Sequence, residues 1–196
     1  MIDSPTLYRI AGWSAALAVV TLIASAIALA IFFRVGEPWG SINDGLIVVT
    51  ALALIPAMIA IDRLAGGQAA WLRIVTIVAI AGAILISVGQ SLLIVRILSL
   101  EGSYVTGGIG LLPILVWLIA LVVLGFGADA VPESIGWTAL ASLVMIVVFS
   151  VVAMITMGPA LWVAAVVLIG VLVAWLLAMS TTFLRLSAEA VGAALA

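Results

Sequence analysis

Long apolar segments alternate with short polar ones six times along this chain. The apolar segments predict membrane-crossing helices over residues 10–33, 45–61, 74–98, 108–126, 135–157 and 160–183. Because an α-helix rises about 1.5 Å per residue, a segment of about 20 residues covers a hydrocarbon core about 30 Å thick. The pattern therefore predicts an all-α fold: a bundle of six transmembrane helices that forms a single domain, 1–196.

The polar segments carry the residues that end and begin helices. The first one, VGEPWGSIND, ends in Asn43 and Asp44, either of which is suited to cap the second helix. Pro56 falls inside the second helix, where it removes one backbone hydrogen bond and predicts a kink. A polar loop is expected over 99–107, and the tail 184–196 is expected to lie on the membrane surface or to fray.

The third apolar segment carries a stripe of small and polar side chains. At about 100° per residue these side chains share a sector of about 120°. They are Thr76, Ala79, Ala83, Ser87, Gln90 and Ser91. We expect the stripe to face other helices, because small and polar residues let membrane helices approach and share hydrogen bonds. We expect this segment alone to place polar side chains deep inside a run of hydrocarbon length.

Composition places the chain in lipid. It is 68% hydrophobic and only 7% charged, whereas soluble domains carry about 25% charged residues. The net charge is −2, Lys is absent and the arginines are scattered, so no basic patch predicts nucleic-acid binding. Membrane lipids are therefore the first predicted partners.

The chain contains neither Cys nor His. Their absence removes thiolates, the usual haem ligand and the commonest catalytic base near neutral pH. All acidic residues fall in loops, at predicted helix ends or in tails, so no midplane carboxylate suggests coupled ion transport. They are Asp3, Glu37, Asp44, Asp62, Glu101, Asp129, Glu133 and Glu189. The sequence thus predicts no enzyme, no metal site and no cofactor.

The arginines predict the orientation in the membrane. Six spans put both termini on one side, which carries Arg9, Arg63, Arg73 and Arg185. The other side carries Arg34 and Arg96. The positive-inside rule therefore favours cytoplasmic termini. Asp62 is expected to pair with Arg73 across a short turn.

The candidate sites lie within the predicted spans. Ser87, Gln90 and Ser91 could bind a small polar solute or a lipid head group, or they could hydrogen-bond a neighbouring helix, which is the favoured interpretation. Arg96 is expected to extend to the membrane interface and to pair with Glu101.

Two tryptophans form a second candidate site. Trp117 and Trp175 lie near the middle of the fourth and sixth spans, where an indole N–H requires a partner.

Two short motifs carry a family resemblance. The opening Tyr8-Arg9-x-x-Gly12-Trp13 and the later run Pro38-Trp39-Gly40-x-Ile42-Asn43-Asp44 resemble a loose group of uncharacterised six-helix bacterial membrane proteins. The resemblance implies a multi-pass protein of the bacterial inner membrane. That group carries no established activity, so the resemblance assigns no site residue.

Three functions remain open from the sequence. The first is a non-catalytic accessory subunit of a membrane complex, or a small homo-oligomer. Small-residue ridges favour it: Gly82 with Gly89, and Gly170 with Ala174 and Ala178. The second is a passive channel for a small neutral solute. The third is a binder of a lipid, quinone or pigment, with Trp117 and Trp175 against the ligand.

Overall fold

The computed structural model describes residues 4–66, 70–127, 131–156 and 158–195. These residues form six helices and no strand: α1 (Ser4–Val35), α2 (Trp39–Leu64), α3 (Ala70–Ile94), α4 (Leu100–Gly127), α5 (Glu133–Ile155) and α6 (Pro159–Leu195). Each helix is long and apolar enough to cross a membrane. The predicted all-α bundle is confirmed, while Asp3, Asp129 and Met157 lie outside the described residues.

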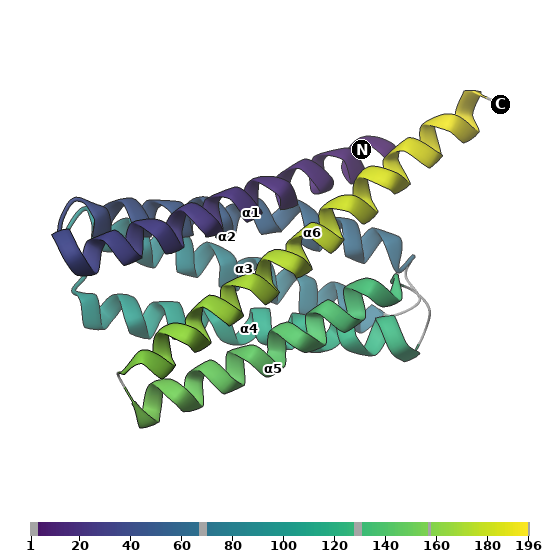
Figure 1. Cartoon of the computed structure of the whole chain (residues 1–196). Coiled ribbons are helices and arrows are strands. Elements are labelled where there is room, and N and C mark those ends of the chain that lie inside the picture. The colour runs from purple at the N-terminus through teal and green to yellow at the C-terminus, as the bar shows by residue number, and fades with distance from the viewer. Residues whose placement is uncertain (1–3, 67–69, 128–130, 157, 196) are drawn as a thin grey trace.

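The helices form a ring in chain order. Each helix packs against the next, and α6 returns to pack against α1. Both chain ends lie at one end of the ring, which we call the terminal end (Figure 1). The turns that join α1 to α2, α3 to α4 and α5 to α6 lie at the opposite end, which we call the distal end (Figure 1).

Two distal helix starts differ from the prediction. α2 begins at Trp39, so Asn43 and Asp44 lie inside it and do not cap it; Pro38 occupies the cap position without a side-chain hydrogen bond. α4 begins at Leu100, so most of the loop predicted over 99–107 is helical. Both helices begin before their apolar segments do. A transmembrane helix can extend beyond the hydrocarbon core, so polar residues near the membrane surface can be helical.

α3 ends in a backbone hydrogen-bond motif, before the end of its apolar segment. The Arg96 N–H donates to the Leu93 carbonyl and the Ile97 N–H donates to the Leu92 carbonyl, each at 2.9 Å. The backbone of Arg96 has the left-handed conformation, with φ 59°. This is the Schellman arrangement, which stops a helix and usually places glycine at the left-handed residue. The predicted span 74–98 therefore ends at Ile94, and Arg96 lies in the following turn.

The C-terminal segment continues α6 to Leu195, contrary to the expected surface tail or fraying. Phe183 is fully buried and stacks on Tyr8 of α1 with ring centroids 6.1 Å apart. The Ser187 hydroxyl donates to the Pro5 carbonyl at 3.0 Å. Packing on the N-terminal part of α1 thus extends α6 beyond its predicted end at residue 183.

Hydroxyl and amide groups hold α1 against α2. Thr21 and Thr50 share a hydrogen bond of 2.7 Å, and the Ser25 hydroxyl donates to the Asn43 side-chain oxygen at 2.7 Å. Polar side chains therefore lie deep in helices other than α3, so the expectation that the third segment is unique in this respect is wrong. The recurrence of Ser14, Thr21 and Ser25 on one side of α1 was the available signal.

The core changes in character along the bundle. The largest fully buried side chains lie near its middle or toward the terminal end: Met58, Ile61, Leu72, Trp117, Leu118, Leu121, Ile135, Leu176, Met179 and Phe183. The buried residues nearest the distal end are small or polar: Ala28, Asn43, Ser87, Gly89, Ser103, Gly110 and Ala164. The terminal half is thus filled by large apolar groups, and the distal half is not.

Candidate functional site

The stripe on α3 turns inward as predicted, with one exception. Thr76, Ala79, Ala83 and Ser87 are buried and Gln90 is half-buried. Ser91 is exposed and its hydroxyl donates to the carbonyl of Ser87 in its own helix, so Ser91 does not belong to the inward surface.

Gln90 is the polar group of α3 that is left without a partner near the distal end. Its Oε1 atom is buried and accepts no hydrogen bond from the described residues. Gln90 and the buried Leu72 are 18 residues apart, which is five turns at about 3.6 residues per turn, so both point to the ring interior. The unpaired oxygen can accept a hydrogen bond from a bound molecule.

Asp44 lies near the start of α2, at the distal end of the bundle (Figure 1). It is 18 residues from Asp62, again about five turns, and therefore lies on the same side of α2. Asp62 pairs with Arg73 of α3 at 3.6 Å, as predicted, so this side of α2 faces α3. Asn43 donates to the Asp44 carboxylate at 3.2 Å while it accepts from Ser25. Ser25, Asn43 and Asp44 thus form a hydrogen-bonded polar group at the distal ends of α1 and α2, and Gln90 of α3 is not bonded to it through its Oε1 atom.

The closest contact between α4 and α5 lies at the terminal end. A Cβ atom added to Gly125 would lie 2.8 Å from the Cα atom of Gly136. Next to this glycine pair, Phe126 and Trp137 pack edge to face with ring centroids 4.7 Å apart. Here the two backbones touch, which only glycine permits.

Toward the distal end, the same side of α4 becomes uncovered. Leu118, Leu111 and Tyr104 follow from Gly125 at steps of seven residues, a spacing that keeps to one side of a helix. Leu118 is 2% exposed, Leu111 38% and Tyr104 72%. Gly107, about five turns from Gly125, would meet nothing within 4 Å if it carried a Cβ atom. α5 is therefore absent from the distal part of this side.

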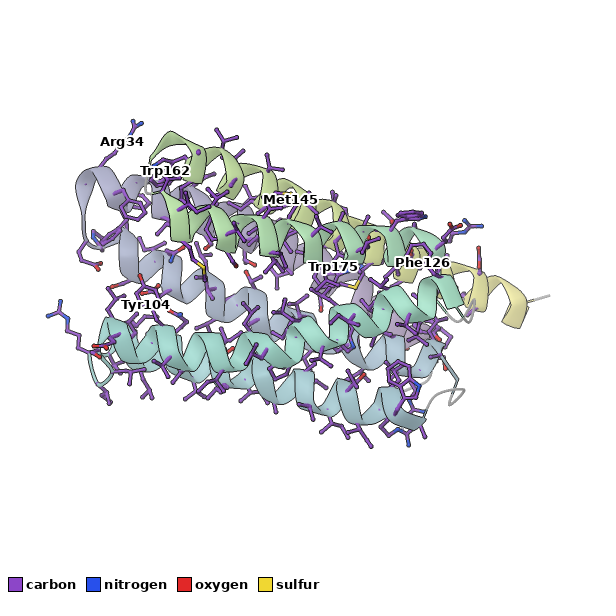
Figure 2. The ribbon with its side chains drawn as sticks, turned by 90° about the horizontal axis from the view of Figure 1, so that it is seen from below. Arg34, Tyr104, Phe126, Met145, Trp162 and Trp175 are labelled. Atoms are coloured by element: carbon purple, nitrogen blue, oxygen red, sulfur yellow. The ribbon has the colours of Figure 1, made fainter. Side chains whose placement is uncertain are left out.

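On α5, too, the side chains become more exposed toward the distal end. Its buried residues, Ile135, Gly136, Ala139 and Ser142, all lie in its terminal half. In the described stretch from Leu143 to Ile155 no side chain is buried. Figure 2 shows α4 and α5 converging near Phe126 and separating toward Tyr104 and Trp162. We call this region the distal seam, defined by Tyr104, Gly107 and Leu111 of α4 and by Leu143 and Ser150 of α5.

The two predicted interior tryptophans meet across the ring. Trp117 of α4 and Trp175 of α6 are 0% and 3% exposed, and their rings pack edge to face at 6.0 Å. Neither indole N–H has a hydrogen-bond partner among the described residues. The pair joins α4 to α6 near the middle of the ring.

The remaining predicted site residues do not join this region. Arg96 is exposed in the turn after α3, and the expected ion pair with Glu101 does not form among the described residues. Gly170 and Ala174 are exposed on α6, and nothing lies within 4 Å of a Cβ atom on Gly170. In contrast, Gly82 and Gly89 pack directly on α4, against Gly110 and Thr106.

The polar side chains of this region can form hydrogen bonds with a ligand. Among the described residues, no three His, Cys, Asp or Glu side chains gather closely enough to hold a metal ion. The available groups are an amide, a carboxylate, hydroxyls and indoles. Comparisons with protein-family models, curated proteins and solved structures find nothing that matches this chain.

Proposed function

We propose that this chain is a non-catalytic membrane protein that binds a membrane amphiphile in the distal seam. The amphiphile is a molecule with one hydrogen-bonding head group and a long apolar tail, a chemistry shared by lipids and quinones. The observation that carries the proposal is the contrast between two glycines on one side of α4. Gly125 touches the backbone of α5, whereas Gly107 faces open space.

The surroundings of the seam fit the two parts of an amphiphile. The walls are apolar, with Leu111 on α4 and Leu143 on α5, so they suit a hydrocarbon tail. Gln90 follows Gly89, which packs on Thr106 of α4, and its unpaired buried oxygen suits the head group. Tyr104 and Leu111 are exposed on a helix that is long and apolar enough to cross a membrane, so we expect the ligand to enter sideways from the lipid.

The packed terminal half favours binding over passage. Trp117, Met58 and Met179 are fully buried near the middle of the ring, and large apolar side chains fill the bundle from there to the terminal end. A neutral solute that reached Gln90 would meet this core and stop. The passive-channel hypothesis therefore has less support than the binding hypothesis.

The accessory-subunit hypothesis has one specific observation in its favour. Gly170 and Ala174 form a small-residue surface that none of the described helices covers. Such a surface suits contact with a helix of another subunit. An accessory protein that carries an amphiphile to or within a complex would satisfy both observations.

We further propose a location in the bacterial inner membrane with both termini in the cytoplasm. The excess of arginine at the terminal end supports this orientation, and the sequence resemblance supports the bacterial membrane. The distal seam would then open into the outer leaflet.

The test uses two neighbouring glycines that both have room for a side chain. Gly107→Phe would fill the seam, whereas Gly108→Phe places the same ring on the adjacent, exposed side of α4. Mass spectrometry of gently extracted protein should detect a bound amphiphile in the wild type and in Gly108→Phe, and at least tenfold less in Gly107→Phe. Equal amounts in all three proteins would overturn the proposal.

A further inference from the structure

A second binding surface lies outside the ring, on α1 near the terminal end. It is a groove with a volume of about 370 Å³, lined by Arg9, Ile10, Trp13, Ser14 and Leu17. Their spacing places them on one side of the helix. Ile10, Trp13 and Leu17 are exposed, so the groove faces the membrane.

Of the two polar side chains in the groove, Arg9 is available to a ligand and Ser14 is not. The Ser14 hydroxyl already donates to the Ala53 carbonyl of α2. Arg9 is exposed, and the ion pairs of the described residues use Arg73 and Arg185 instead. Arg9 therefore brings a positive charge that no described carboxylate neutralises. A guanidinium group is always charged and presents donors in a geometry that matches phosphate.

The apolar part of the groove fits a hydrocarbon chain. Arg9 and Leu17 are eight residues apart, which corresponds to about 12 Å along the helix. One leaflet contributes about 15 Å of hydrocarbon. Trp13, 65% exposed, lies between them on the same side of the helix. Exposed indole rings favour the membrane interface, so we expect this ring at the level of the lipid glycerol backbone. The groove thus runs from a cationic head-group position into the apolar leaflet.

We propose that this groove binds an anionic phospholipid from the leaflet at the terminal end. The phosphate and the anionic head group contact Arg9, the glycerol region contacts the Trp13 ring, and one acyl chain lies over Ile10 and Leu17. The site is separate from the distal seam, because it lies on the outer side of α1 and near the opposite end of the bundle.

The test compares phosphatidylglycerol with phosphatidylcholine of the same acyl chains, by native mass spectrometry of the full chain. The wild type should retain phosphatidylglycerol about fivefold better, the factor that about 1 kcal/mol per basic residue near an anionic lipid implies. Arg9→Gln should remove this preference, and Arg9→Lys should keep most of it.

The control is Arg63→Gln, which removes an exposed arginine at the same end of the bundle, outside the groove. It should keep the fivefold preference. An equal loss in Arg63→Gln and Arg9→Gln would show general charge attraction and overturn the proposal, as would an unchanged preference in Arg9→Gln. As an independent measure, phosphatidylglycerol with brominated chains should quench wild-type fluorescence more than brominated phosphatidylcholine does. Trp13→Phe should remove that difference, and persistence of the difference would contradict binding at this groove.

Discussion

Gly125 of α4 and Gly136 of α5 meet backbone to backbone, so closely that a Cβ atom on Gly125 would lie 2.8 Å from the Gly136 Cα atom. No side chain fits between these helices at this point. The glycine pair closes the ring at the terminal end, and the separation of α4 and α5 toward the distal end begins from it. We therefore expect substitutions at the two ends of the α4–α5 pair to have different effects on stability.

Gly125→Val should destabilise the bundle. The added methyl groups would overlap with the backbone of α5, and overpacking of this kind costs about 1–3 kcal/mol. Thermal unfolding in detergent, followed by circular dichroism, should show a lower midpoint. Gly107→Val is the matched control, because that position is open, and its midpoint should stay within experimental error of the wild type. A similar loss in both variants would contradict the open seam.

Arg96→Gly should stabilise the protein. Arg96 holds the left-handed position of the Schellman motif with φ 59°, which glycine adopts without the steric cost of a side chain. We expect a gain of up to about 1 kcal/mol in the free energy of unfolding. Arg96→Ala, which keeps a Cβ atom, should give no such gain. If Arg96→Gly lowered the stability, the arginine side chain would have a role that its exposed position does not indicate.

Asn43→Leu should weaken the contact between α1 and α2. The change keeps the side-chain size but removes the bond from Ser25 and the bond to Asp44. Hydrogen bonds between membrane helices contribute about 0.6 kcal/mol each on average, so a loss of about 1 kcal/mol is expected in an unfolding titration with denaturing detergent. Ser91→Ala, at an exposed position of α3, should change the stability by less than about 0.5 kcal/mol. Equal effects would show that the buried amide is unimportant.

Gln90→Leu should separate ligand binding from stability. Since the Gln90 oxygen accepts no bond from the described residues, its loss should leave the unfolding midpoint unchanged. Loss of one hydrogen bond to the head group, worth about 1 kcal/mol, should lower amphiphile retention about fivefold. Ser87→Ala should retain the amphiphile, because the Ser87 hydroxyl already donates to Ala83. A lower midpoint in Gln90→Leu would instead assign Gln90 to helix contact.

The features that depend on hydropathy could be predicted from the sequence. The six helices follow from the apolar segments, and the inward position of Thr76, Ser87 and Gln90 follows from helical periodicity. The helix ends did not follow. Asn43 and Asp44 look like caps in the sequence, yet they lie in the second turn of α2, because a helix can extend past its apolar segment.

The distal seam could not have been predicted from the residues that line it. Gly107 and Gly125 occupy the same side of α4, and nothing in their neighbouring residues shows that one is in contact and the other is open. The difference depends on the angle between α4 and α5, which is set by packing of the whole ring. The polar residues that α1 turns toward α2 did have a sequence signal, the recurrence of Ser14, Thr21 and Ser25 on one side, although the stripe on α3 is longer.

Distances between spin labels across the α4–α5 pair test the central claim most directly. The chain has no cysteine, so two introduced cysteines label cleanly. One pair, Phe126→Cys with Trp137→Cys, reports the terminal end, and the other, Leu111→Cys with Ser150→Cys, reports the distal seam. Double electron–electron resonance and continuous-wave spectra in lipid nanodiscs should give a short separation for the first pair and a clearly longer one for the second. Equal separations for the two pairs would mean that α4 and α5 run side by side, and would contradict the seam and the binding function built on it.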